Sequence, residues 1–122
     1  MSNDTTHGPE RLRVYALAVH LGELIDDLLT ETRCRATLAS QIRRAADSLV
    51  LNIGEGSAHF SPGRKLYHYQ TALGSVAEVI AGLARLRVRH PNANIFRARN
   101  TADLISAMLT ALIHTQQNRL KK

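Results

Sequence analysis

Polar side chains that could form a hydrogen-bonded network recur at spacings of three and four between residues 41 and 55. We name this set, with one carboxylate that the expected packing brings to it, the polar ladder: Gln41, Arg44, Ser48, Asn52, Glu55 and Glu78. An apolar stripe with helical spacing runs beside the ladder from Ile42 to Gly56. Because polar groups at the edge of a core need partners, the pattern favours a partly buried network. A solvated flank of an amphipathic helix would show the same spacing.

Residues with the chemistry to hold a metal are few in this sequence. A di-iron carboxylate bundle needs Glu-x-x-His pairs on two helices, and no glutamate here is followed by histidine three positions later. Glu55 and His59 are four residues apart and His68 could approach them, so a metal site at that turn is conceivable. His59 is explained more simply as a loop residue. We therefore predict no metal and no cofactor.

Catalytic patterns are equally sparse. Cys34 lies between Arg33 and Arg35, which would favour its thiolate, but no histidine is close to it in the sequence. A glycine-rich phosphate-binding loop of the GxxxxGK[ST] type is absent. The chain is predicted not to be an enzyme, and an enzyme that uses Glu55, His59 and His68 with a metal is the alternative.

Composition indicates a small basic domain. The chain has 122 residues and a formal net charge of +6, and 13 of its 16 basic residues are arginine. Arginine binds phosphate and carboxylate in a bidentate manner, so an anionic partner such as RNA or DNA is favoured, although many small basic proteins are simply soluble cations. Three Tyr, two Phe and no Trp make a poor stacking surface. Any contact with nucleic acid is expected to be sequence-independent and directed at phosphates.

Three features of the sequence indicate the compartment in which the protein resides. Residues 1–8 are short and polar, without the apolar region of a signal peptide, and charges interrupt every apolar stretch before about 20 residues. A single cysteine fits a reducing compartment. We expect a cytoplasmic protein with no membrane segment.

Four helical segments must position these residues. Residues 1–8 are predicted to be a disordered lead, residues 9–118 a four-helix bundle and residues 119–122 a basic tail. Pro9 and Pro62 suit first helical turns, and Ser61 is an N-cap. No segment alternates like a strand, so the fold class is all-α, an antiparallel up-down-up-down four-helix bundle. The first helix is apolar over more than one face, as expected of a helix that either lies in the middle of a core or is shared between a core and a neighbouring subunit.

Antiparallel packing of the second and third helices predicts particular neighbours. Small residues of the two helices would meet and let the backbones approach closely: Ala45 and Ala46 with Gly74 and Ser75. Asn52 would face Tyr67 or His68. Arg44 and Glu78 would form an ion pair inside the polar ladder, and a buried pair of this kind is costly to break.

The same topology brings the first and third connections to one end of the bundle. We name the basic residues expected there the arginine-rich end: Arg33, Arg35, Arg85, Arg87, Arg89, Arg97 and Arg99. Such a cluster is a candidate nucleic-acid-binding site. Arginines at the C-terminus of a helix also complement its dipole, so a purely structural role is the alternative.

Two runs of the sequence, QIRRAADSLVLNIGEG and ALGSVAEV, resemble motifs of a known four-helix bundle family. The members of this family were first noticed as 23S rRNA-intervening sequence proteins, encoded within bacterial large-subunit rRNA genes. The matching positions are Gln41, Arg43, Arg44, Ala45, Ser48, Asn52, Ile53, Glu55, Gly56, Ala72, Leu73, Gly74, Ser75, Ala77 and Glu78. Val50 and Gly54 depart from the proline and alanine usual in the family. The resemblance implies closed homo-oligomeric rings, often pentamers. The chain is also similar to an accessory protein of diversity-generating retroelements, which works with a reverse transcriptase and nucleic acid.

Together, the residues and the resemblance lead to a functional prediction. We expect a non-enzymatic, ring-forming homo-oligomer that binds nucleic acid or a nucleoprotein through the arginine-rich end. The alternative is a protein–protein assembly module that docks an acidic partner without touching nucleic acid. Neither hypothesis includes a membrane.

Overall fold

The computed structural model describes the backbone of residues 4–122 and the side chains of residues 10–122. Four helices account for nearly all of this part of the chain: α1 (Asp4–Thr32), α2 (Ala36–Ala58), α3 (Pro62–Arg89) and α4 (Phe96–Leu120). Residues 4–122 contain no strand. The all-α prediction is confirmed.

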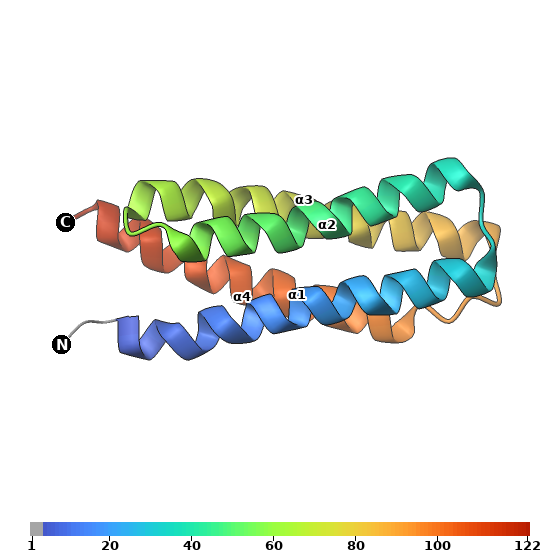
Figure 1. The fold of residues 1–122 in the computed structure, drawn as a ribbon, viewed down its shortest axis with the longest axis horizontal. Helices are drawn as coiled ribbons and strands as arrows, with labels where there is room; N and C mark the ends of the chain where they lie inside the picture. Colours follow the sequence, from blue (N-terminus) through green and yellow to red (C-terminus); the bar gives the residue numbers. More distant parts are fainter. Residues whose placement is uncertain (1–3) are drawn as a thin grey trace.

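The helices run alternately up and down in one bundle (Figure 1). α1 packs on α2 and α4, and α3 packs on the same two helices, whereas the backbones of the diagonal pairs stay farther apart within the described residues. The α1–α2 and α3–α4 connections lie at one end. The α2–α3 connection and the C-terminus lie at the other. This arrangement confirms the predicted antiparallel up-down-up-down four-helix bundle.

Local hydrogen bonds explain several helix ends. The Ser61 hydroxyl accepts a hydrogen bond from the Arg64 amide at 3.3 Å and starts α3, with Pro62 in its first turn. The Asn94 side-chain oxygen accepts from the Phe96 amide at 3.2 Å, which satisfies one free donor at the start of α4. α1 ends where Arg33 adopts a left-handed backbone with φ of 51°.

The start of α1 differs from the sequence-based expectation. Helix is present from Asp4, whereas the sequence predicts disorder over residues 1–8, and residues 1–3 lie outside the described part of the chain. Pro9, expected in the first turn, is the sixth residue of α1, so it removes one i→i−4 hydrogen bond rather than a free donor of the first turn. At the other terminus, α4 continues to Leu120, into the segment predicted as a basic tail.

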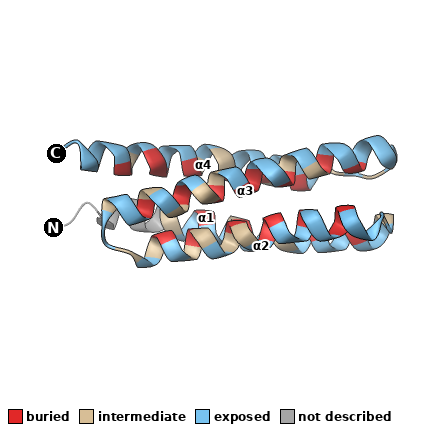
Figure 2. Cartoon of the chain, turned by 90° about the horizontal axis from the view of Figure 1, so that it is seen from above, coloured by how far each residue is buried: buried red, intermediate tan, exposed pale blue. Residues whose placement is uncertain are grey.

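The core lies between the facing sides of all four helices, and Figure 2 shows buried positions recurring along their inner faces. Large aliphatic residues from every helix are fully buried, among them Leu21, Ile53, Leu83 and Ile105. Each such side chain contributes about 1.5–3 kcal/mol relative to exposure, so the core supplies most of the bundle's stability.

The close approach of α2 and α3 involves some of the predicted residues but not all of them. Ala45, Ala46 and Ser75 are buried as expected, but Gly74 is exposed, and no atom of another helix lies within 4 Å of where its Cβ would be. Gly74 comes one residue before Ser75, hence about 100° around the helix, on the outer face. The tight contact is at Gly82, where an added Cβ would lie 2.6 Å from Cγ1 of Ile42.

Candidate functional site

Part of the polar ladder forms a directional chain of hydrogen bonds between α2 and α3. The Ser75 hydroxyl donates to the Thr71 carbonyl at 3.1 Å, so in its 2.9 Å contact with Ser48 it acts as the acceptor. The Asn52 amide nitrogen donates to the Ser48 carbonyl at 2.9 Å and to the Ser48 hydroxyl at 3.3 Å. Asn52 Oδ1 lies 3.1 Å from His68 Nδ1. The predicted facing of Asn52 and His68 is confirmed.

These hydrogen bonds determine which ring nitrogen of neutral His68 carries the hydrogen. Because the amide nitrogen of Asn52 is committed to Ser48, its oxygen must face the imidazole and can only accept. His68 therefore carries its hydrogen on Nδ1 when it is neutral. The lone pair of Nε2 is then available to a ligand.

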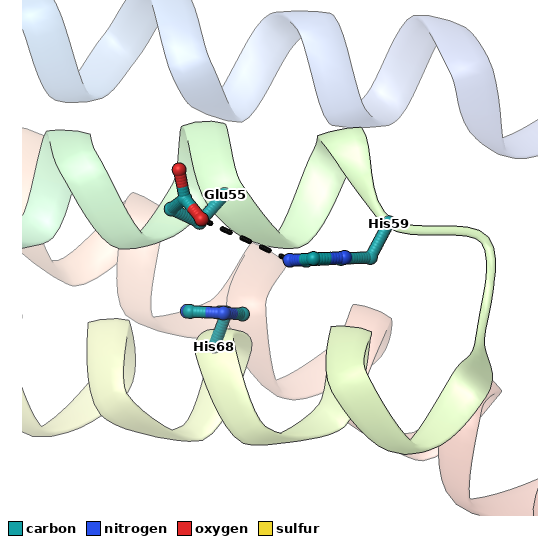
Figure 3. Close-up of side chains that lie close together, drawn as sticks. All are labelled: Glu55, His59 and His68. Carbon is teal, nitrogen blue, oxygen red and sulfur yellow. Dashed lines mark ion pairs between the residues drawn. The ribbon is translucent and has the colours of Figure 1, made fainter.

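Two further side chains converge on His68 at the end of α2. The His59 and His68 rings are parallel, with 6° between their planes and 5.3 Å between their centroids, and Glu55 Oε1 lies 3.8 Å from His59 Nε2. Figure 3 shows the three side chains pointing toward one another. One ligand atom from each lies within 4.8 Å of the other two. The structure thus brings together the residues that the sequence left as a conceivable site.

The other ladder residues remain in contact with solvent. Gln41, Arg44, Glu55 and Glu78 are exposed, and no ion pair joins Arg44 to Glu78 among the residues that the structure describes. The predicted buried pair is wrong, because both side chains lie on the solvent side of the α2–α3 contact, where hydration competes with pairing. Arg44 and Glu78 line a groove of about 620 Å³, together with Ser48.

The arginine-rich end exists as predicted in position, because both connections that contribute to it lie at one end of the bundle (Figure 1). All seven arginines are exposed. Within the described part of the chain, one of the seven forms an ion pair, Arg99 with Asp103 at 3.1 Å. Arg97 borders a small pocket with Asp27 and Glu31 between α1 and α4.

The three arginines at the end of α3 do not share one face. Successive residues turn by about 100°, so Arg85 and Arg87 lie on opposite flanks of the buried Leu86, and Arg89 falls near Arg85. Arg85 lines the groove with Arg44, which places its flank toward α2. The cations therefore surround the end of the bundle rather than form a single stripe.

A second polar cluster, which sequence reasoning missed, closes the opposite end of the bundle. Lys65 is buried and donates from Nζ to the carbonyls of Gly56 at 3.0 Å and Ser57 at 3.5 Å, and Arg11 donates to the Ser57 carbonyl at 3.4 Å. Both cations meet carbonyls at the C-terminus of α2, where they complement the helix dipole. The sequence did contain a signal that Lys65 is buried: it lies one helical turn before the buried Tyr69, on the inner stripe of α3.

Tyr69 completes this cluster. Burial raises the pKa of its phenol, while the Ser57 side chain and the positive charge of Arg11 each oppose that rise. The Ser57 hydroxyl is buried, and its contact with the phenol lacks the geometry of a full hydrogen bond, so it has no hydrogen-bond partner among the described residues. Burial is the larger effect, so the phenol stays neutral well into the alkaline range.

A protein-family model matches most of the chain. The model of the 23S rRNA-intervening sequence protein family matches residues 10–111, which run from α1 through most of α4. No curated protein and no solved structure matches the chain significantly. None of the helices described is long and apolar enough to cross a membrane. With a family match over most of its length and the four-helix architecture in place, the chain belongs to the 23S rRNA-intervening sequence protein family.

Proposed function

We propose that this protein is a non-enzymatic, cytoplasmic, ring-forming homo-oligomer that binds nucleic acid or a nucleoprotein through its arginine-rich end. The observation that carries the proposal is the exposure of all seven arginines at one end of the bundle, six of them without an ion pair among the described residues. Exposed guanidinium groups without acidic partners are available for bidentate contact with phosphate. The analogy with the accessory protein of diversity-generating retroelements points the same way and stays a prediction.

The arrangement of the cations favours backbone contact over base reading. Because Arg85 and Arg87 lie on opposite flanks of α3, they would meet phosphates at separate points on a strand or fold. Phe96, next to Arg97, is an exposed ring that one base could stack on. Binding by this surface would be electrostatic, sequence-independent and strongly dependent on salt.

The first prediction concerns single-stranded RNA. Affinity is expected to fall steeply as salt rises, and to drop when Arg85, Arg87 and Arg89 are all replaced by Ala. Each arginine that binds a phosphate should, on removal, reduce the slope of log K against log salt by about 0.7. Fluorescence anisotropy with a labelled RNA at several salt concentrations measures both quantities.

The chain offers a matched control at its other end. Replacing Arg119, Lys121 and Lys122 with Ala removes the same charge from the C-terminus of α4, opposite the arginine-rich end (Figure 1). This variant should bind nearly as tightly as the wild type. Equal reductions of affinity in the two variants, or no binding at low salt, would overturn the proposal. A complex with an acidic protein that survives nuclease treatment would favour the assembly-module alternative.

Ring formation has its own support in the outer face of α1. Leu12, Tyr15 and Val19 follow one another at spacings of three and four, and all are exposed. A run of apolar side chains on a charged surface marks a contact with another molecule, and self-association through α1 would bury it.

The second prediction tests this face. Leu12→Glu is expected to shift the wild-type oligomer, a pentamer by family resemblance, toward monomer, because a carboxylate would be buried in the contact. Leu51 is a matched control: its exposed fraction is 67%, against 65% for Leu12, but it lies on the outer side of α2. Mass photometry of both variants gives the masses. A monomeric wild type, or dissociation by Leu51→Glu alone, would contradict the α1 contact.

A further inference from the structure

The end of the bundle opposite the arginine-rich end presents two imidazoles and a carboxylate to one another. Glu55 belongs to the last turn of α2, His59 follows the end of that helix, and His68 belongs to the second turn of α3. Their ligand atoms lie within 4.8 Å of one another. Two nitrogens and one oxygen are the donor set that zinc takes in open, three-ligand protein sites.

The hydrogen bonds around His68 prepare it as a ligand. A ligating histidine usually donates its second ring N–H to a fixed acceptor, which sets its tautomer and orientation. Asn52 supplies that acceptor at 3.1 Å, and its own orientation is set by two bonds to Ser48. The Nε2 lone pair of His68 is therefore oriented before any ligand arrives.

The other two side chains would have to rotate to close on a cation, because the stacked His59 and His68 rings hold their lone pairs in parallel planes. Donor atoms around tetrahedral zinc lie about 3.3 Å apart, as follows from bonds of about 2.0–2.1 Å. Glu55 is exposed and half-buried His59 sits in extended backbone at the helix end, so both can rotate toward Nε2 of His68 without disturbing the core. Their present contact, 3.8 Å between Glu55 Oε1 and His59 Nε2, is long and would be replaced by bonds to the metal.

We propose that Glu55, His59 and His68 form a binding site for a divalent transition metal of the zinc class, with a fourth position open to water. Bound metal would join the end of α2 to the start of α3 across the connection at residues 59–61. The site lies at the opposite end of the bundle from the arginines and does not depend on the proposed function. It would add to the stability of the fold in proportion to metal concentration.

Titration of untagged protein with Zn²⁺ and with Co²⁺ tests the site. Calorimetry should show one metal per chain, and bound Co²⁺ should give the intense visible absorption of a low-coordinate complex. Zn²⁺ should also raise the melting temperature. Affinity should decrease at lower pH, since metal and protons compete for the same ligand atoms.

Two substitutions and one control test whether Glu55 and His68 are ligands. Glu55→Gln and His68→Gln should each lower the affinity at least tenfold, and because Glu55 is exposed its variant keeps the fold. His20→Gln is the matched control, since His20 pairs with Glu23 at 3.7 Å without a second imidazole described beside it, and it should bind as the wild type does. Binding that survives Glu55→Gln, or that falls equally in His20→Gln, would overturn the site, as would the absence of binding.

Discussion

Replacing Tyr69 with Ala is expected to lower the free energy of unfolding by about 3–5 kcal/mol, the range for removal of a buried aromatic side chain. The Tyr69 side chain is 1% exposed and is the largest of those fully buried. Its removal would leave a cavity beside α2, because the ring packs against the backbone at Gly56. Urea unfolding followed by circular dichroism measures the change.

Tyr67 is the natural control, since it is two residues away on the same helix and 64% exposed. Tyr67→Ala should change the unfolding free energy by less than about 1 kcal/mol, as surface substitutions do. Similar destabilisation by the two substitutions would contradict the described packing of α3.

Substitution of Gly56 tests the same contact with Tyr69 from the side of α2. A Cβ at this position would lie 2.7 Å from Cε1 of Tyr69, so Gly56→Ala should be destabilising in the wild type. In the Tyr69→Ala background the ring is gone and most of that penalty should disappear. A double-mutant cycle should therefore give a coupling energy above about 0.5 kcal/mol, whereas additive effects would show that the two residues do not touch.

Gly82→Ala is expected to be destabilising although alanine is the better helix former. Its Cβ would lie 2.6 Å from Cγ1 of Ile42, which is buried and has a β-branched side chain that cannot easily rotate away. Overpacking of this kind costs about 1–3 kcal/mol, and the helix propensity of alanine offsets about 1 kcal/mol of it.

Gly74→Ala isolates the packing effect. Gly74 is on the same helix but exposed, with no atom of another helix within 4 Å of an added Cβ, so the substitution should stabilise by about 0.5–1 kcal/mol. Since both variants gain the same propensity, the difference between their unfolding free energies measures the overpacking at Ile42. Equal stability of the two proteins would mean that α2 and α3 do not approach closely at Gly82.

These two glycines show where sequence reasoning succeeded and where it did not. Small residues correctly indicated that α2 and α3 pack closely, because only small side chains let two helix backbones approach. The pattern did not specify which small residues face the partner. Gly74 and Ser75 are adjacent in the sequence but about 100° apart on the helix, and the orientation of α3 about its axis is decided by packing of all four helices.

For the polar residues, too, the sequence indicated the types of side chain correctly but not their contacts. Arg44 and Glu78 have the right types and spacing for a buried pair, yet both are exposed on the solvent side of the α2–α3 contact. His59 and His68, in contrast, were weak candidates, since nothing in their spacing reports that their rings become parallel. The extended connection after α2 and the Asn52 hydrogen bond produce that geometry.

The sequence by itself determined the four helices, their alternating direction and the end at which the arginines gather. These follow from local periodicity, capping residues and short connections, which act within a few residues of one another. Tertiary structure alone decided which side chains touch across helices, including Gly82 with Ile42, Lys65 with the end of α2, and the Glu55, His59 and His68 cluster. Such contacts depend on the rotation and register of whole helices, and these are set by the summed packing of the core rather than by any local pattern.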